Sequence, residues 1–300
     1  MAAHTRKTYR ALRRTAPLLL AAVLVLAAGC GPRLTRVGTP GTAPPPAQQA
    51  SREQLLARYN LLARQVRSLR ASVRLQATTG SPFAGIVRQY HQIDGLLLAE
   101  RPDRLRLIGQ APVVGTSLFD LASSGGQFRL FIPSRHEFVV GRNDAPPRPD
   151  RPLDNLRPEH LLQALFWSPI APEQPVVLEE EETEQPPARF YVLSVIDVHG
   201  SEWEISRRIW FDRSDLHLCR IELFGPQGRL EADIQLRAWS GSAEQAFPRE
   251  LMLRRPQEDY RLTIELRRLE LNAAIPADRF QLAQPPGSRR VVVGEPGGTP

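Results

Sequence analysis

Apolar residues recur at three- and four-residue steps between positions 51 and 69, which predicts an amphipathic helix. They form one stripe with an Arg/Gln face opposite: Leu55, Leu56, Tyr59, Leu62, Val66 and Leu69. Ser51 is placed to cap its N-terminus. Two interpretations of the helix are open. The favoured one is packing of the stripe onto a sheet, and the other is binding to a membrane surface.

From residue 71 onward the period changes to two, which predicts half-buried antiparallel strands with one wet face. The clearest run is 229–239, where apolar and polar residues alternate throughout. In 259–271 the alternation slips after Leu266, and a β-bulge near Arg267–Arg268 explains the slip. The candidate strands, some of which merge to give roughly ten or eleven, cover residues 71–79, 84–91, 94–100, 103–109, 117–123, 127–132, 136–141, 188–198, 202–212, 216–224, 229–239, 248–254 and 259–271.

A second helix is predicted over 157–168, after a Pro-rich loop at 142–155. Its residues Leu161, Leu162, Leu165 and Phe166 are expected to face inward. The acidic run 179–182 with Glu184 is interpreted as a solvated loop. The fold class predicted is mainly β (α+β): a curved antiparallel sheet that forms an unclosed half-barrel covered by about two helices.

The first thirty residues have the pattern of a secretory signal. Five basic residues precede the apolar run 18–28, which is too short to span a bilayer comfortably. The run ends in Ala27-Ala28-Gly29-Cys30, which resembles the lipobox of bacterial lipoproteins. We therefore expect a lipoprotein signal peptide at 1–29 and a lipid, palmitate among its acyl groups, on Cys30. A plain secreted protein is the alternative.

The predicted organisation after the signal has three parts. Residues 30–50 hold the lipid anchor site and a flexible tether rich in Pro, Gly, Thr and Ala. Residues 51–287 form the folded domain, and 288–300 form a flexible tail without clear periodicity.

Charge and motif content argue against several function classes. The formal charge is +7, but five positive charges lie in the signal, so the remainder carries 34 − 32 = +2, which does not indicate a nucleic-acid partner. The sequence contains no HExxH motif and no closely spaced cysteines that would bind zinc. It also contains no GxSxG nucleophile elbow and no phosphate-binding loop. We expect a non-enzyme without metal or cofactor, and Cys219 to behave as a small buried hydrophobe. An envelope hydrolase remains a third interpretation.

Several short motifs occur in an order known from one family. They are Arg101-Pro102-Asp103 before a strand, Gly115-Thr116 before Phe119, Gly126-Gln127-Phe128, Phe138-Val139-Val140-Gly141, and Ile275-Pro276-Ala277-Asp278-Arg279-Phe280 before a Pro-Gly turn. Over roughly residues 51–287 the chain resembles the LolA/LolB-like superfamily of outer-membrane lipoprotein-sorting carriers and receptors.

The resemblance implies an unclosed β-barrel with a helical lid over an apolar cavity that accepts acyl chains of lipoproteins or lipids. The lipobox favours the membrane-anchored receptor type. Its implied place is the outer membrane, facing the periplasm, which Gly31 after Cys30 also favours, and a soluble periplasmic carrier is an implied partner. The alternative from another class is a structural or sensory envelope module that binds protein partners.

The resemblance also suggests site residues. The candidates for the apolar cavity are Leu105, Leu107, Phe119, Leu121, Phe128, Leu130, Trp203, Ile205, Ile209 and Phe211. Phe83, Val113 and Val114 are candidates for a loop that inserts into membrane or cargo. Arg106 and Arg129 are possible counterparts of an arginine inside the carrier's barrel, but no role is assigned to them.

Overall fold

The structure is a computed structural model, and it describes residues 46–81, 86–112, 115–143, 157–184, 187–241 and 246–293. Cys30, the signal and the loop residues Phe83, Val113 and Val114 lie outside the described residues. The unit Pro45–Pro300 is compact and contains the hydrophobic core.

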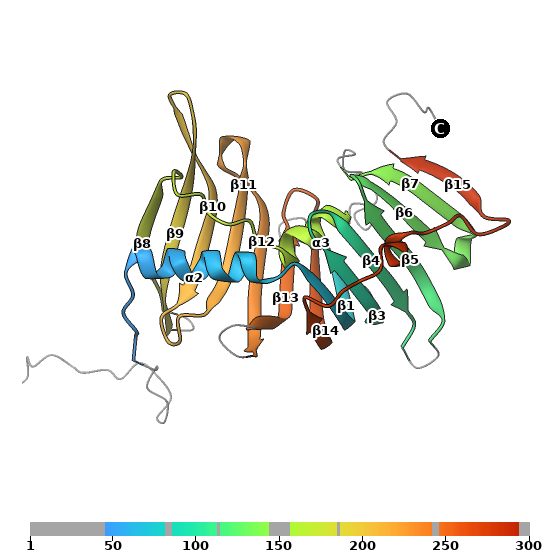
Figure 1. Cartoon of the computed structure of the whole chain (residues 1–300), viewed down its shortest axis with the longest axis horizontal. Coiled ribbons are helices and arrows are strands. Elements are labelled where there is room, and N and C mark those ends of the chain that lie inside the picture. Colours follow the sequence, from blue (N-terminus) through green and yellow to red (C-terminus); the bar gives the residue numbers. More distant parts are fainter. Residues whose placement is uncertain are drawn as a thin grey trace, which may run out of the picture. The chain divides into compact units, whose positions relative to one another are not determined.

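Two antiparallel meanders form one open sheet around the central strand β1 (Figure 1). Strand β1 pairs with β3, the start of the first meander, and with β14, the end of the second. The order across the sheet is β15-β7-β6-β5-β4-β3-β1-β14-β13-β12-β11-β10-β9-β8, and β2 pairs with β1. The strands are β1 (Ser68–Ser81), β2 (Ile86–Gln89), β3 (Ile93–Glu100), β4 (Arg104–Gln110), β5 (Ser117–Ser124), β6 (Gln127–Ile132), β7 (Glu137–Arg142), β8 (Val176–Glu184), β9 (Pro187–His199), β10 (Glu202–Asp212), β11 (Leu218–Gly225), β12 (Arg229–Ser240), β13 (Phe247–Arg255), β14 (Tyr260–Leu271) and β15 (Arg289–Val293).

The two edge strands are the elements that the sequence analysis missed. The acidic run predicted as a loop is β8, which pairs along its length with β9. An edge strand keeps glutamates hydrated while its backbone still pairs, so the charges do not prevent a strand there. The predicted flexible tail likewise contains β15, which pairs in parallel with β7.

Two α-helices lie within the described residues, and both were predicted. Helix α2 (Arg52–Gln65) starts with a capping box between Ser51 and Gln54, and it buries Leu55, Tyr59 and Ala63. Helix α3 (Pro158–Leu165) buries Leu161, Leu162 and Leu165. In Figure 1, α2 crosses the strands of the second meander. We call the sheet face covered by α2 and α3 the inner face.

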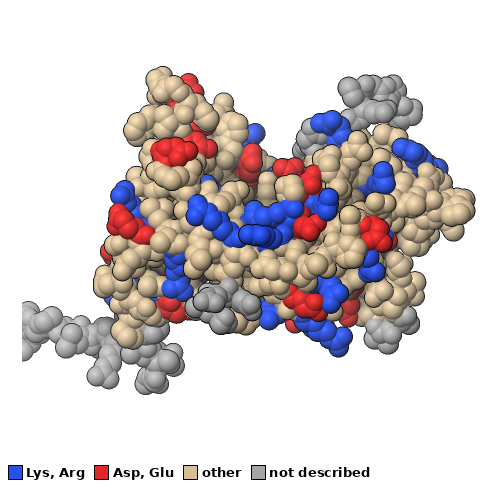
Figure 2. Space-filling view, viewed as in Figure 1, with Lys and Arg blue, Asp and Glu red and all other residues tan. Residues whose placement is uncertain are grey.

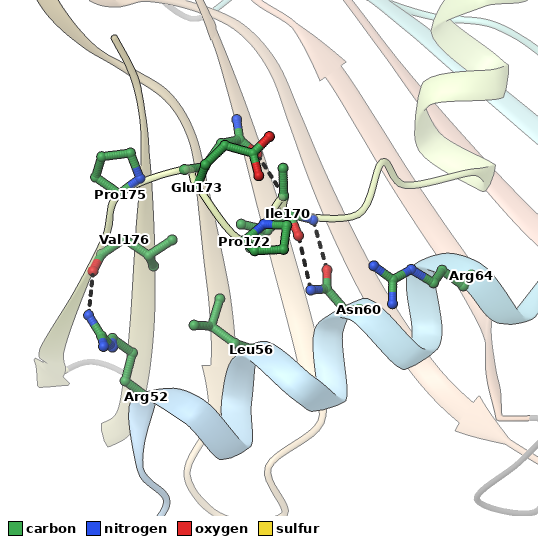
Figure 3. Close-up of a pocket in the computed structure, with 11 residues that line it drawn as sticks. Arg52, Leu56, Asn60, Arg64, Ile170, Pro172, Glu173, Pro175 and Val176 are labelled. Atoms are coloured by element: carbon green, nitrogen blue, oxygen red, sulfur yellow. Dashed lines mark hydrogen bonds between the residues drawn. The ribbon is translucent and has the colours of Figure 1, made fainter.

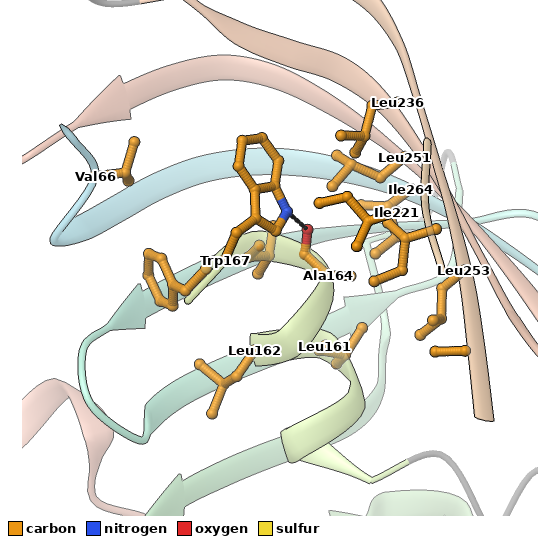
Figure 4. Packing of buried hydrophobic residues seen from close by; sticks show 14 of the residues in the cluster. Val66, Leu161, Leu162, Ala164, Trp167, Ile221, Leu236, Leu251, Leu253 and Ile264 are labelled. Carbon is orange, nitrogen blue, oxygen red and sulfur yellow. Dashed lines mark hydrogen bonds between the residues drawn. The ribbon is translucent and has the colours of Figure 1, made fainter. Parts of the chain in front are cut away.

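The inner face carries the main core, and its pattern follows the predicted alternation. In β12, Ala232, Ile234 and Leu236 are buried. The predicted bulge in β14 is confirmed, because the register with β1 shifts between Arg70 and Ser72. Figure 4 shows the indole of Trp167 between α3 and the apolar residues of β11–β14. The predicted fold class, an unclosed and mainly antiparallel sheet with helices on one face, is confirmed.

The opposite, outer face is covered over β5–β7 by the C-terminal segment. A short 3₁₀ helix, η5 (Ala277–Phe280), precedes Leu282, which packs in a second cluster with Ala122 and Phe138. The segment therefore covers apolar positions of the first meander that α2 and α3 do not reach.

Candidate functional site

Three pieces cover the inner face: α2, α3 and the connection at residues 166–175, which we call the strap. Arg101, in the turn between β3 and β4, ties two of them together. Its Nε donates to Val66 O at 2.9 Å, and its Nη2 donates to Ala63 O and Trp167 O, both at 2.8 Å. The guanidinium lies 5.0 Å from the centre of the Phe166 ring. Burial lowers the pKa of Arg101 from its ordinary value.

Arg207 holds the strap from the sheet side. This β10 residue is only 9% exposed, and its Nη1 donates to Ser168 O at 2.6 Å. Its Nη2 donates to Pro169 O at 3.3 Å and to Gln174 Oε1 at 3.4 Å. Tyr59 of α2 donates to the same Ser168 carbonyl at 3.0 Å. A cation on the inner face thus binds main-chain carbonyls of the strap, and such charge-assisted hydrogen bonds are strong.

Asn60 of α2 makes a two-way contact with the strap, at the edge of a pocket of about 530 Å³ (Figure 3). Its Nδ2 donates to Ile170 O at 3.1 Å, and its Oδ1 accepts from Ile170 N at 2.7 Å. The apolar lining comes from Leu56, Ile170, Pro172, Pro175 and Val176, and Arg52 and Arg64 also line the pocket. This strap pocket has the size and apolar lining that are typical of ligand sites.

Replacing Arg207 with methionine is expected to loosen the strap selectively. Three carbonyl acceptors lose their charged donor, and each such loss weakens a structure by about 1–3 kcal/mol. We expect amide hydrogen exchange in residues 166–176 to accelerate roughly 10- to 100-fold. Mass spectrometry of exchanged peptides measures this.

Arg208→Met is the matched control for this experiment. Arg208 neighbours Arg207 in the chain, but it pairs with Glu179 and Glu181 on the outer face. Exchange in the strap should not change in this variant. Equal acceleration in both variants would mean that Arg207 does not hold the strap.

A polar pair is buried beneath α3. His160 Nδ1 lies 2.6 Å from Tyr260 Oη, and their ring centres are 6.1 Å apart. Burial, together with the positive charges of Arg255 and Arg157, lowers the pKa of His160 to about 3. Burial also raises the pKa of Tyr260. The imidazole is therefore neutral at physiological pH, and it contributes to packing and hydrogen bonding rather than to charge.

Most residues proposed for the cavity lie on the inner face. Six are buried in the main core: Leu105, Leu107, Leu121, Phe128, Ile209 and Phe211. Phe119 and Leu130 are partly buried and pack against the same core. These side chains pack against one another and against the cover, so an acyl chain would have to displace part of the cover to reach them.

Trp203 and Ile205 lie elsewhere. Their side chains are 67% and 42% exposed, near the tip of the β9–β10 hairpin. The register with β9 shifts between Ile205 and Arg207, and this bulge ends the simple alternation along β10. The expectation that both residues share the inward face of Ile209 and Phe211 is therefore wrong. Trp203 and Ile205 join Val177 and Val198 as exposed apolar residues of β8–β10, which we call the hairpin patch.

Arg207, which holds the strap, is one of four buried arginines of the described residues, with Arg157, Arg213 and Arg255, and neither arginine named from the sequence is among them. Arg106 pairs with Asp120 at 2.5 Å and also donates to the carbonyl of Gln281. Arg129 donates to Leu282 O at 3.3 Å. Both thus bind the C-terminal segment on the outer face. The available sequence signal was Arg207 itself, the charged residue that interrupts the apolar alternation of β10.

Side chains arranged for metal binding or nucleophilic catalysis are few in the part of the chain that the structure describes. It contains no group of three or more His, Cys, Asp or Glu side chains arranged to hold a metal ion. Burial, with the nearby carboxylates of Asp212 and Asp215, raises the pKa of Cys219 to about 12. A thiol held protonated is a poor nucleophile. Within the same residues, no helix combines the length and apolar character needed to cross a bilayer.

Comparison with known proteins gives similarity in structure only. No family model matches the sequence, and no curated protein matches it either. Similar solved structures include a LolA superfamily protein from Nitrosomonas europaea, with 10% identity, a TM-score of 0.47, and coverage of 78% of this chain and 99% of that one.

Two more solved structures are similar to a comparable degree. A DUF1329 family protein from Desulfovibrio piger has 13% identity and a TM-score of 0.49, covering 76% of this chain and 97% of that one. A putative outer membrane lipoprotein-sorting protein domain from Vibrio parahaemolyticus has 12% identity and a TM-score of 0.44, covering 75% and 94%.

Proposed function

We propose that the protein binds acyl chains of lipoproteins or lipids non-covalently, without catalysing a reaction. The observation that carries this proposal is the strap pocket, a mainly apolar opening between α2 and the strap whose lining also holds Arg52, Arg64 and Glu173. An acyl chain with an anionic head group matches both features: the chain would contact Leu56, Ile170 and Val176, and the head group would meet Arg52 or Arg64.

The cover supports a mechanism of opening and release. The main chain of the strap binds α2 and β10 mainly through Asn60 and Arg207. Three strap side chains, Phe166, Trp167 and Ile170, also pack in the core. In the proposed mechanism, these hydrogen bonds break when an acyl chain enters and form again when it leaves. The newly exposed apolar inner face, including Leu105 and Phe211, would then contact the chain, at about 25 cal/mol per Å² buried.

The proposed location is the outer membrane, facing the periplasm, with the chain anchored by lipid on Cys30. The support is the lipobox-like sequence Ala27-Ala28-Gly29-Cys30. Mass spectrometry of the mature N-terminus, combined with membrane fractionation, tests this part. An unmodified Cys30 in a soluble fraction would contradict it.

Acyl binding is tested on the chain from residue 31, which lacks the anchor site and keeps the whole core. We expect lipid to co-purify, and an acylated peptide to bind with an affinity that falls about tenfold in Leu56→Gln, because a buried leucine contributes about 1.5–3 kcal/mol. Leu61→Gln is the matched control, since Leu61 is exposed on the same helix. A lipid-free domain that also refuses the acylated peptide would rule out the proposal.

The second candidate is an envelope module that binds a protein partner. The hairpin patch favours it, because it gathers four of the eight large exposed apolar side chains of the described residues. Trp203 is a residue type enriched at protein interfaces. The acyl-binding experiment separates the candidates, because a protein-binding module with a filled core takes up no acylated peptide.

A further inference from the structure

The solvent-facing side of α2 combines an exposed leucine with arginines. Arg58, Leu61 and Arg64 are three residues apart, so they span an arc of about 120° on the helix surface. Leu61 is 60% exposed, the second-highest value among the large apolar side chains described. Arg67, also exposed, follows just beyond the helix end. We call these four residues the α2 outer face.

The three arginines of this face have no ion-pair partner among the described residues. By contrast, Arg52 at the start of the helix pairs with Glu53 at 3.0 Å, and arginines of the sheet, such as Arg106 and Arg220, pair with aspartates. Figure 2 shows basic side chains gathered over this helix. The positive charge is therefore available to an external partner.

Helices that lie on anionic membranes combine basic residues with apolar side chains that enter the interface. In α2 the apolar stripe packs on the sheet, so Leu61 is the apolar residue that the basic side offers to a membrane. Arginines near the surface interact with phosphates, and the apolar side chain enters the interface between head groups and acyl chains. The position of α2 in the chain also fits contact with a membrane, because α2 is the first described element after the predicted lipid anchor and tether. Arg64 belongs both to this face and to the lining of the strap pocket.

We propose that the α2 outer face docks on a bilayer that contains anionic phospholipids, with Leu61 entering the interface and Arg58, Arg64 and Arg67 contacting head-group phosphates. Docking would place the strap pocket next to the membrane. This inference deepens the proposed function, because it turns the acyl-binding site toward the membrane. Membrane docking itself does not depend on acyl binding; only the benefit of that orientation rests on the proposed function. It does not require the lipid on Cys30.

The test is co-sedimentation of the chain from residue 31 with vesicles of phosphatidylcholine, with or without phosphatidylglycerol. We expect binding only when phosphatidylglycerol is present, and loss of binding in 1 M salt, where the Debye length falls to about 3 Å. The triple variant Arg58→Gln/Arg64→Gln/Arg67→Gln should bind on the order of 100-fold more weakly, at about fivefold for each arginine. Leu61→Ser should lower affinity about tenfold.

The control variant is Arg88→Gln/Arg229→Gln/Arg261→Gln, which removes the same charge from exposed arginines of β2, β12 and β14. It should bind vesicles like the unmodified chain. Equal weakening in both triple variants would reduce the effect to net charge and overturn the proposal. Binding that does not depend on phosphatidylglycerol would also overturn the proposal. The absence of any binding would overturn it too, and would favour a protein as the partner of the α2 outer face.

Uptake of an acylated peptide in solution, measured on the unmodified chain because Arg64 also lines the strap pocket, separates this inference from the proposed function. Vesicle binding without acyl uptake would contradict the proposed function alone. Acyl uptake without vesicle binding would contradict the docking proposal alone.

Discussion

Replacing Trp167 with alanine is expected to lower the free energy of unfolding by about 3–5 kcal/mol, the range for large aromatic residues in a core. Trp167 is 5% exposed and stacks on Phe247, with ring centres 5.8 Å apart. Its ring also meets Trp239 at 6.2 Å, and its Nε1 donates to Ala164 O at 3.1 Å. The residue joins the strap and the end of α3 to β12 and β13, so its loss affects the cover and the sheet together.

Thermal unfolding followed by circular dichroism measures this effect. At about 2–4 °C per kcal/mol for a domain of this size, the midpoint should fall by roughly 6–20 °C. Trp203→Ala is the matched control, because it is the same replacement at a residue that is 67% exposed. That variant should stay within about 0.5 kcal/mol of the unmodified protein. Similar losses in both would contradict the assigned role of Trp167.

His160 is expected to make the protein markedly less stable in acid. The folded protein holds the pKa of His160 at about 3, whereas an unfolded chain has a histidine pKa of about 6.5. Below pH 6.5 the unfolded state binds a proton that the folded state refuses, so stability falls as the pH falls toward 3. Between pH 7 and pH 4, this residue alone should remove about 3 kcal/mol from the free energy of unfolding.

The measurement is urea unfolding at pH 7 and pH 4 for the unmodified protein and for His160→Gln, whose amide can still bond to the Tyr260 hydroxyl. The variant should lose about 3 kcal/mol less across this interval. Carboxylates that titrate in the same range affect both proteins and cancel in the difference. His199→Gln, the same change at the exposed end of β9, should lose stability as the unmodified protein does. An equal loss in His160→Gln would show that His160 accepts its proton without unfolding.

Elements with one dry face were predictable from residue spacing. The alternation of β12 and the slip in β14 identified both strands and a bulge, because a sheet face buried on one side requires every second residue to be apolar. The stripe of α2 worked in the same way at helical spacing. Strand β8 was missed because only Val176 and Leu178 of its inner face pack against the core. The glutamates that follow them leave too short an apolar alternation to detect.

The candidate site was predictable only in part. Leu105, Leu107, Ile209 and Phe211 follow the period of their strands, and they lie on the inner face as expected. The bulge of β10 interrupts its period, so the outward position of Trp203 required the structure. Arg207 keeps the period of Ile209 and Phe211, but that period does not reveal what its guanidinium binds. The strap contacts join groups about a hundred residues apart, such as Asn60 and Ile170, and local sequence spacing contains no information about such pairs.

The pairing of β1 with β14 has a consequence for how the chain reaches its fold. Leu69 lies opposite Leu271, so the two meanders join only after almost the whole domain has been synthesised. Until then β1 has an unpaired edge with apolar residues beside it, and β3 is its only long neighbour. Such contacts between distant residues slow folding and prolong the exposure of strand edges. A nascent chain that stops before residue 260 would therefore be a preferred substrate for holding chaperones, and in their absence it would be prone to pair with a second copy of itself.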